Sequence, residues 1–281
     1  MSPTSRARWR TEVIATLAAA IIGVIALDAT QLVAAPSKAA ARPPTVVDRH
    51  PVGPTGGPQL RLLRWSGHSW LVYPNDQTGP EQVPLSNSNA AVHVDSHGRL
   101  HLAIVHERGT WRSVELESLD PVSYGTFTMV VDTATANFDP YTVLGMFVYR
   151  PGSKKLTNEI DVEDSRYPHL LKAPNNAQFA VQPYYTPGNL HPYALTAADG
   201  HLFQQFTWLP GTPGNGIARF ETRAGTTARS PLIANWKYQG YAVPQPYDMH
   251  LYINLWMNKN ESPRTGTHSA ILRSYSFEPA Y

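Results

Sequence analysis

The sequence predicts an all-β protein, an antiparallel β-sandwich built from short strands. Charged residues make up only 16% of the 281 residues, while the chain contains 25 Pro and 19 Gly. This balance favours short strands joined by many turns over long, salt-bridged helices. Short runs rich in β-branched and aromatic residues follow one another, and no stretch has the length and period of a long helix. Strand after strand in this order predicts two packed antiparallel sheets.

The N-terminal part of the chain has the features of an export signal. Three arginines within the first ten residues precede the apolar stretch 13–27, which no charge interrupts, and small residues follow it. An apolar run of about 15 residues is short against the roughly 20 that span a bilayer. We therefore expect a signal peptide, residues 1–41, and no stable membrane insertion after its removal. The protein would be secreted or extracytoplasmic, and retained in the cell envelope if the segment is not cleaved.

A spacer and one domain follow the expected signal. Residues 42–59 are rich in Pro, Gly and Ala and have no hydrophobic period, which predicts a disordered spacer. Residues 60–281 show no internal repeat and no change in composition, so we expect them to form a single domain. The chain has no Cys, and its stability must come from its own core without disulfides.

The elements of the domain are expected in the following order. The first strands are 60–65, 68–73, 90–95, 100–105 and 111–118. The middle strands are 125–133, 143–149, 158–164 and 178–185, and the last are 203–209, 216–223, 249–256 and 269–277. Each run is rich in β-branched or aromatic residues, and turn residues such as Asp95-Ser96-His97-Gly98 and Asp199-Gly200 lie between runs. Short connections of this kind predict antiparallel pairing.

The segment Asn158-Glu159-Ile160-Asp161-Val162-Glu163-Asp164 alternates acidic and β-branched residues. In a strand, this period of two places Glu159, Asp161 and Glu163 on one face and the aliphatic residues on the other. Three close carboxylates cannot all be ionised in a dry core, so their face should meet solvent or a cleft. Like charges this close raise at least one pKa, and a proton kept near neutral pH is what a general acid needs.

The spacing within this row also fits glycoside hydrolysis. The Cα atoms of Glu159 and Glu163 lie roughly 13 Å apart on an extended strand with a rise of about 3.3 Å per residue. Two Glu side chains that lean inward can bring their carboxyl groups to the ~5 to 5.5 Å of retaining glycosidases, with Asp161 beside the nucleophile. An exposed strand with an acidic outer face accounts for the motif alone equally well.

Aromatic residues shift the balance towards a polysaccharide cleft. The chain has seven Trp and fourteen Tyr, and sugar rings pack on flat aromatic faces. A single aromatic residue on a strand is more often part of the core, so only the set as a whole indicates a cleft. Its members on candidate strands are Tyr124, Tyr149, Tyr184, Trp208, Tyr252 and Trp256.

These residues resemble glycoside hydrolase family 16, which includes lichenases, laminarinases and xyloglucan transglycosylases. Glu159-Ile160-Asp161-Val162-Glu163 is similar to the E-I-D-I-E signature of the family. Weaker similarities follow in family order over most of residues 60–281, at Tyr124-Gly125-Thr126-Phe127, Leu144 to Tyr149, Phe206-Thr207-Trp208 and Met249 to Trp256. The resemblance implies a concanavalin A-like lectin/glucanase fold, a jelly roll.

The resemblance also implies roles for individual residues. Glu159 would be the nucleophile, Asp161 its helper and Glu163 the acid/base. The substrate-binding residues that it implies are Tyr124, Glu117, Asn254 and Trp256. Where lichenases continue with Phe-Leu-Gly, this chain has Asp164-Ser165-Arg166-Tyr167. This departure predicts a shorter strand and a different cleft edge, and it leaves the class of glucan open.

Neither metals nor nucleic acids are favoured as partners. His93, His97, His101 and His106 have no Cys partner and no H-E-x-x-H spacing, so we expect no metal site and no cofactor. Members of the family often hold a structural Ca²⁺, for which this sequence designates no ligands. A formal charge of +2 without a basic stripe argues against nucleic-acid binding. We expect a monomer.

Two functional classes follow from the sequence. The first is an endo-acting retaining glycoside hydrolase that cleaves β-glucan-type polysaccharide, or a transglycosylase on the same scaffold. The second is a lectin-like carbohydrate-binding domain without catalysis. The carboxylate row favours the enzyme, because mutual repulsion of three acids destabilises a domain that only binds sugars.

Overall fold

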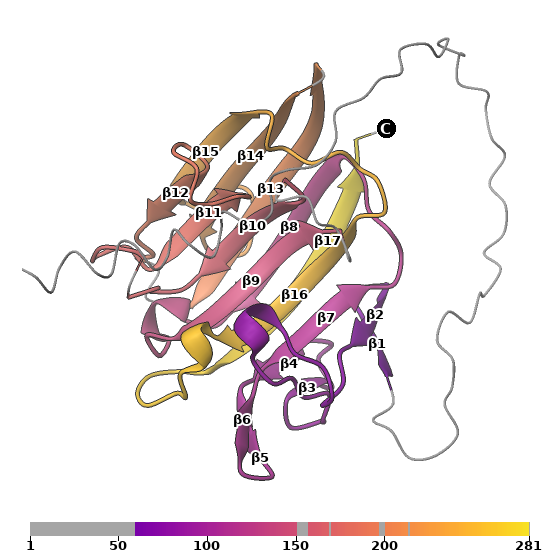
Figure 1. Ribbon diagram of the computed structural model, residues 1–281, viewed down its shortest axis with the longest axis vertical. Coiled ribbons are helices and arrows are strands. Elements are labelled where there is room, and N and C mark those ends of the chain that lie inside the picture. The colour runs from indigo at the N-terminus through magenta and orange to yellow at the C-terminus, as the bar shows by residue number, and fades with distance from the viewer. Residues whose placement is uncertain (1–59, 151–156, 169, 197–199, 213, 281) are drawn as a thin grey trace, which may run out of the picture. The chain divides into compact units, whose positions relative to one another are not determined.

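The computed structural model describes residues 60–150, 157–168, 170–196, 200–212 and 214–280. Their regular elements are strands in antiparallel sheets and three short 3-10 turns, which confirms the predicted fold class (Figure 1). The expected signal peptide and spacer lie outside the described residues. Within the described ranges, no helix is long and apolar enough to cross a membrane.

The larger sheet has eight strands in the order β1-β2-β7-β16-β9-β10-β11-β12. Their bounds are β1 (Arg61–Trp65), β2 (His68–Val72), β7 (Val114–Ser118), β16 (His250–Met257), β9 (Thr142–Tyr149), β10 (Glu159–Asp164), β11 (Ala177–Val181) and β12 (Leu190–Tyr193). All neighbouring strands pair antiparallel. The acidic strand β10 therefore lies inside the sheet, between β9 and β11.

The second sheet has seven strands in the order β15-β14-β13-β8-β17-β4-β3. Their bounds are β15 (Leu232–Gly240), β14 (Asn215–Ala224), β13 (His201–Thr212), β8 (Gly125–Asp132), β17 (Ser269–Pro279), β4 (Leu100–Ala103) and β3 (Val92–Val94). A separate hairpin, β5 (Val105–Glu107) and β6 (Thr110–Arg112), projects beside the sheets (Figure 1). Three 3-10 turns are η2 (Pro80–Gln82), η3 (Thr135–Asn137) and η4 (Asn258–Asn260).

Apolar side chains from the inner faces of both sheets form one core. Phe179 of β11 stacks on Phe220 of β14 with ring centroids 5.1 Å apart, so the aromatic packing crosses from one sheet to the other. Ile160 and Val162 of β10 belong to the same buried cluster. Burial of these two side chains contributes about 1.5 to 3 kcal/mol each, and it fixes the opposite face of β10 as the one that carries the three acids.

Each strand expected from the sequence overlaps an observed one, but two observed strands were not expected. β12 contains Pro192, and only two of the nine residues of β15 are buried, so neither shows the apolar alternation that predicts a strand. Both are edge strands, where Pro and polar residues are tolerated. The expected strand 178–185 was too long, because β11 ends at Val181 and residues after it turn back towards β12.

Asp164, the last residue of β10, points into the core instead of joining the acidic face. Its side chain is 1% exposed, and Gln204 of β13, in the opposite sheet, donates from Nε2 to Oδ1 at 2.7 Å. Burial raises the pKa of Asp164 to about 7. The carboxyl group is thus protonated at mildly acidic pH, as the low-polarity surroundings require.

This burial predicts a pH-dependent difference between the wild type and Asp164→Asn. Between about pH 4 and pH 7 the unfolded chain releases the Asp164 proton while the folded protein retains it, so the wild type loses stability as the pH rises. Asn has no proton to lose. We expect the free energy of unfolding in urea, compared at pH 4 and pH 7, to shift in favour of the variant by on the order of 3 kcal/mol. A difference that does not change with pH would contradict the assignment.

Candidate active site

The three acidic residues of β10 lie on one face of the eight-stranded sheet, here called the carboxylate face. Glu159 and Glu163 are partly buried and Asp161 is 2% exposed, whereas Ile160 and Val162 point into the core. The alternation expected from the sequence is therefore present. Because β10 pairs with both β9 and β11, neighbouring side chains enclose the row and remove much of its water.

Cross-strand pairing places three rows of side chains beside the acids. Glu163 pairs with Gly145 of β9, which pairs with Asn254 of β16, which pairs with Glu115 of β7. The next row contains Asp161, Phe147, Tyr252 and Glu117. The third contains Glu159, Tyr149 and His250. The carboxylate face thus combines five acids with amide and aromatic side chains.

Asp161 is a buried acid beside Glu159. Burial, followed by the charges of Glu159 and Glu163, raises the pKa of Asp161 well above its usual range. The protonated Asp161 hydrogen-bonds to Glu159, and Gln182 donates from Nε2 to Asp161 Oδ2 at 3.1 Å. Glu159 therefore keeps an ionisable carboxylate beside a neutral acid.

The pKa of Glu159 is raised to about 7, chiefly by burial. The hydrogen bond from Asp161 acts in the opposite direction, while the charges of Glu163 and Glu115 add to the increase. Protonation of Glu159 thus changes near neutral pH, where a carboxylate in water would always be ionised.

Glu163 is held by two neutral donors. The hydroxyl of Tyr167 donates to Oε1 at 2.7 Å and the amide of Gln178 donates to Oε2 at 2.5 Å. Burial raises the pKa of Glu163, and the bonds from Gln178 and Tyr167 oppose this increase. The two glutamates therefore differ, since Glu159 is bonded to another acid and Glu163 to an amide and a phenol.

Two acids of β7 extend the carboxylate face. Glu115 accepts a hydrogen bond from Asn254 Nδ2 at 3.2 Å, and burial raises its pKa to about 7. Glu117 accepts a hydrogen bond from the hydroxyl of Tyr73 and lies 3.5 Å from His250 Nδ1. The sequence analysis proposed Glu117 but missed Glu115. The alternation Val114-Glu115-Leu116-Glu117 carries the same signal as β10 and could have revealed it.

Gly145 allows Asn254 to reach across the sheet. A Cβ atom at this glycine would lie 2.6 Å from Asn254 Oδ1, closer than real Cβ contacts. The absence of a side chain on β9 at this position leaves room for the amide between Glu163 and Glu115.

Three of the four predicted sugar-binding residues lie on or near the carboxylate face, and the fourth, Tyr124, lies beside the other sheet. Asn254 and Glu117 lie in the rows of the carboxylate face. Trp256 packs on Tyr167, with ring centroids 6.3 Å apart, and so lies near Glu163. Tyr124 immediately precedes β8 of the other sheet and donates from its hydroxyl to Gln245 Oε1 at 3.1 Å. A sugar-binding role of all four stays a prediction.

Some of the aromatic residues expected to form a cleft lie on the carboxylate face, and others lie in the core. Tyr149 is partly exposed on the carboxylate face, as expected for a cleft, whereas Tyr252 lies on the same face but is only 3% exposed. Trp208 was wrongly included, because its side chain is fully buried in the core and its indole N–H donates to the carbonyl of Pro244 at 3.1 Å. Trp208 shares its face with the buried Phe206, while Thr207 between them is on the opposite face, so the period of two already indicated an inward position.

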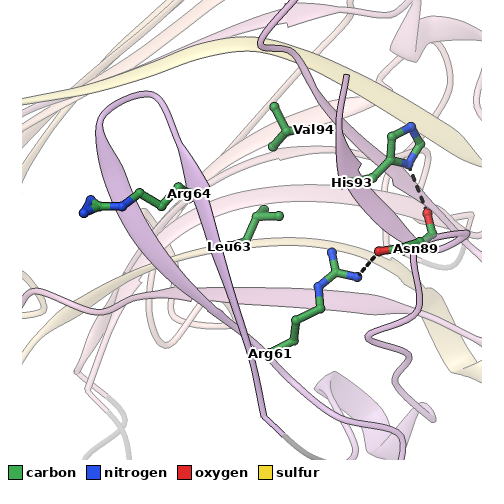
Figure 2. A pocket seen from close by; sticks show the side chains of 6 residues that line it. All are labelled: Arg61, Leu63, Arg64, Asn89, His93 and Val94. Atoms are coloured by element: carbon green, nitrogen blue, oxygen red, sulfur yellow. Dashed lines mark hydrogen bonds between the residues drawn. The ribbon is translucent and has the colours of Figure 1, made fainter. Parts of the chain in front are cut away.

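One of two cavities in the described part of the protein lies away from the three acids, and the other begins beside Glu159. Figure 2 shows one of about 640 Å³, lined by Arg61, Leu63, Arg64, Asn89, His93 and Val94. It belongs to the sandwich edge formed by β1 and β3, and four strands separate β1 from β10. The other, of about 200 Å³, is lined by residues that include Arg150, Asn158 and Tyr247, and Asn158 immediately precedes Glu159. In the described part of the chain, no group of three or more His, Asp or Glu side chains has the geometry to hold a metal ion.

Comparison with known proteins shows likeness in structure only. No protein-family model matches the chain, and no curated protein matches it. Solved structures of similar fold include a β-1,3-1,4-glucanase (lichenase) from a mouse hindgut metagenome, with a TM-score of 0.52 and 15% identity over 75% of this chain and 92% of that one. A Bacillus licheniformis β-glucanase gives a TM-score of 0.53 and 17% identity over 81% of this chain and 100% of that one.

A third similar structure is described as an immunostimulatory antigen and pseudo β-1,3-glucanase of Mycobacterium tuberculosis. Its TM-score is 0.54, with 14% identity over 75% of this chain and 91% of that one. At such identities the likeness shows the fold, a jelly-roll β-sandwich of the kind found in glucan hydrolases. Activity must be argued from the residues of this chain.

The contact at Gly145 predicts a coupling that a double-mutant cycle can measure. Gly145→Ala should lower the free energy of unfolding by about 1 to 3 kcal/mol, because the new methyl group meets Asn254 Oδ1. In an Asn254→Ala background the same change should cost at least ~1 kcal/mol less, since the obstructing amide is gone. Equal costs in both backgrounds, measured by urea unfolding, would show that the two positions are independent.

Proposed function

We propose that this protein is a secreted, endo-acting retaining glycoside hydrolase that cleaves a β-glucan-type polysaccharide. Glu159 acts as nucleophile, Glu163 as acid/base, and Asp161 as the neutral helper of the nucleophile. The likeness of the fold to β-glucanases and the resemblance of Glu159-Ile160-Asp161-Val162-Glu163 to the family 16 signature support this proposal.

The observation that carries the proposal is the unequal environment of the two glutamates. Asp161 stays protonated and donates to Glu159, which leaves a carboxylate that can attack carbon. Glu163 has no acid as hydrogen-bond partner, and burial raises its pKa, so it can hold a proton for a leaving group. Two acids with different environments and separate roles are what a retaining glycosidase requires.

The reaction would proceed in two displacements. In the first, Glu159 forms a bond to the anomeric carbon while the glycosidic C–O bond breaks and Glu163 gives its proton to the departing oxygen. In the second, water attacks the same carbon, the bond to Glu159 breaks, and Glu163 takes up the proton of the water. A sugar hydroxyl in place of water would make the protein a transglycosylase.

The polar residues next to the acids suit a glycan substrate. Asn254 and Glu115 occupy the same cross-strand row as Glu163, and amides and carboxylates hydrogen-bond sugar hydroxyls. Tyr149, which is partly exposed, contributes aromatic surface on the same face. The five acids of this face favour an uncharged polymer over a polyanion, because like charges repel at short range.

A binding protein without turnover is the second candidate. One structure of the same fold is described as a pseudo β-1,3-glucanase, so the jelly roll alone does not imply hydrolysis. In that case the carboxylate face would bind a glycan as a lectin does, with the acids as hydrogen-bond acceptors.

Substitution of the two glutamates separates these candidates. Glu159→Gln and Glu163→Gln keep the shape of the side chain but remove the nucleophile or the proton donor, and each should lower kcat by roughly 10³-fold. Reducing-sugar release from barley β-glucan, lichenan, laminarin and xyloglucan would measure this. Glu221→Gln, in β14 of the other sheet, is the matched control and should retain activity.

The pattern of outcomes decides between the classes. Release by the wild type that both variants lack supports the hydrolase, and retained anomeric configuration in the first product, seen by proton NMR, supports the double displacement. Glycan binding by the wild type without release from any polymer supports the lectin-like protein. Unchanged turnover in either variant would rule out the assigned mechanism.

A further inference from the structure

We infer that Tyr167 is a positioning residue for Glu163, whose hydroxyl stabilises the carboxylate that Glu163 becomes when it gives up its proton. The inference rests on the proposed function, since it concerns the acid/base of that reaction. Its basis is the turn after β10, which brings Tyr167 back against Glu163.

The contact itself is direct. Tyr167 lies three residues beyond the end of β10 and donates from its hydroxyl to Glu163 Oε1 at 2.7 Å. Gln178 donates to the other oxygen at 2.5 Å. The Tyr167 ring is 6% exposed and packs on Trp256. Two donors, one to each oxygen, fix the orientation of the carboxyl group.

The turn holds the tyrosine in a conformation that bulky residues seldom adopt. Tyr167 has a φ of 33°, in the left-handed region. Its amide donates to Ser165 Oγ at 3.2 Å, and its carbonyl accepts from the amide of Leu171 at 2.9 Å. Ser165 is in turn anchored by its amide, which donates to the carbonyl of Asn176 at 2.9 Å. Unfavourable backbone conformations maintained by surrounding bonds are concentrated at functional sites.

The turn supplies a hydrogen-bond donor for the negative charge that forms on Glu163 during the reaction. As the proton leaves Glu163 for the glycosidic oxygen, negative charge develops on the carboxylate, and donors already in place stabilise it without reorganisation. Burial raises the pKa of Tyr167 well above its usual range, so its hydroxyl keeps its proton and remains a donor. When Glu163 later takes a proton from water, the same hydrogen bond persists.

Only neutral groups are in place to stabilise the ionised carboxylate of Glu163 in the described part of the protein. Glu159 and Asp161 precede it on the same strand, and Asp164 follows on the opposite face. Within the described ranges, no Lys, Arg or His forms an ion pair with Glu163. The facing positions of β9 and β11 are Gly145 and Gln178, which carry no charge.

Tyr167→Phe removes the hydroxyl alone and should shift the pH profile. Glu163 must be protonated to act as acid, so kcat/KM falls as the pH rises through its pKa. Loss of a donor to the carboxylate raises this pKa, and the alkaline limb should move to higher pH by at least about half a unit. We expect kcat to fall roughly tenfold with KM within about twofold.

Tyr275→Phe is the matched control, since Tyr275 is a buried tyrosine of β17 in the other sheet. It should leave both limbs of the profile unchanged. A Tyr167→Phe protein with wild-type kcat and an unmoved alkaline limb would overturn the inference, as would an equal shift in both variants.

A measurement without substrate separates this inference from the proposed function. The carboxyl carbon of Glu163 can be titrated by NMR in protein labelled with ¹³C-glutamate, assigned by its loss in Glu163→Gln. A midpoint that rises in Tyr167→Phe supports control of this acid by Tyr167, even if the wild type cleaves none of the polysaccharides. An unmoved midpoint overturns it, whatever the activity of the wild type.

Discussion

Burial of three carboxyl groups on one interior strand is the constraint on which the remaining features of this domain depend. Ile160 and Val162 anchor β10 in the core, and this fixes the acids on the opposite face, where pairing with β9 and β11 removes water from them. Ionised neighbours at this spacing repel one another strongly. Burial raises the pKa of Asp161, which keeps this acid neutral beside Glu159, and two neutral donors bind Glu163.

Much of this arrangement could be predicted from the sequence, because a period of two fixes the faces of a strand regardless of its partners. The acidic row and its buried opposite face follow from residues 159–163 alone. Strands without alternation escaped prediction, as β12 and β15 show. The sequence also could not show that Gln178 and Tyr167 meet at Glu163, because pairing register and turn geometry bring distant positions together only in three dimensions. Glu115 was missed although its alternation was visible.

The same sandwich fold includes structures described as glucanases and one described as a pseudo-glucanase. The scaffold therefore supplies a sheet face, and individual side chains decide what that face does. In this chain the acid/base Glu163 of the proposed function is followed by the turn residues Ser165-Arg166-Tyr167. Asp164, the last residue of β10, points into the core and is bonded by Gln204 of the other sheet, and the turn that follows returns Tyr167 to Glu163. One short segment thus links the acid/base to both sheets.

The strand order delays folding of the domain until late in its synthesis. β16 lies between β7 and β9, and β17 lies between β8 and β4, so two strands late in the sequence occupy interior positions of both sheets. Neither sheet is complete until these residues have left the ribosome, and long-range pairings of this kind form slowly. The nascent chain must therefore remain open through most of its translation. A premature stop codon before β16 would remove the middle of both sheets rather than an edge, and the truncated product would be a substrate for proteolysis instead of a smaller domain.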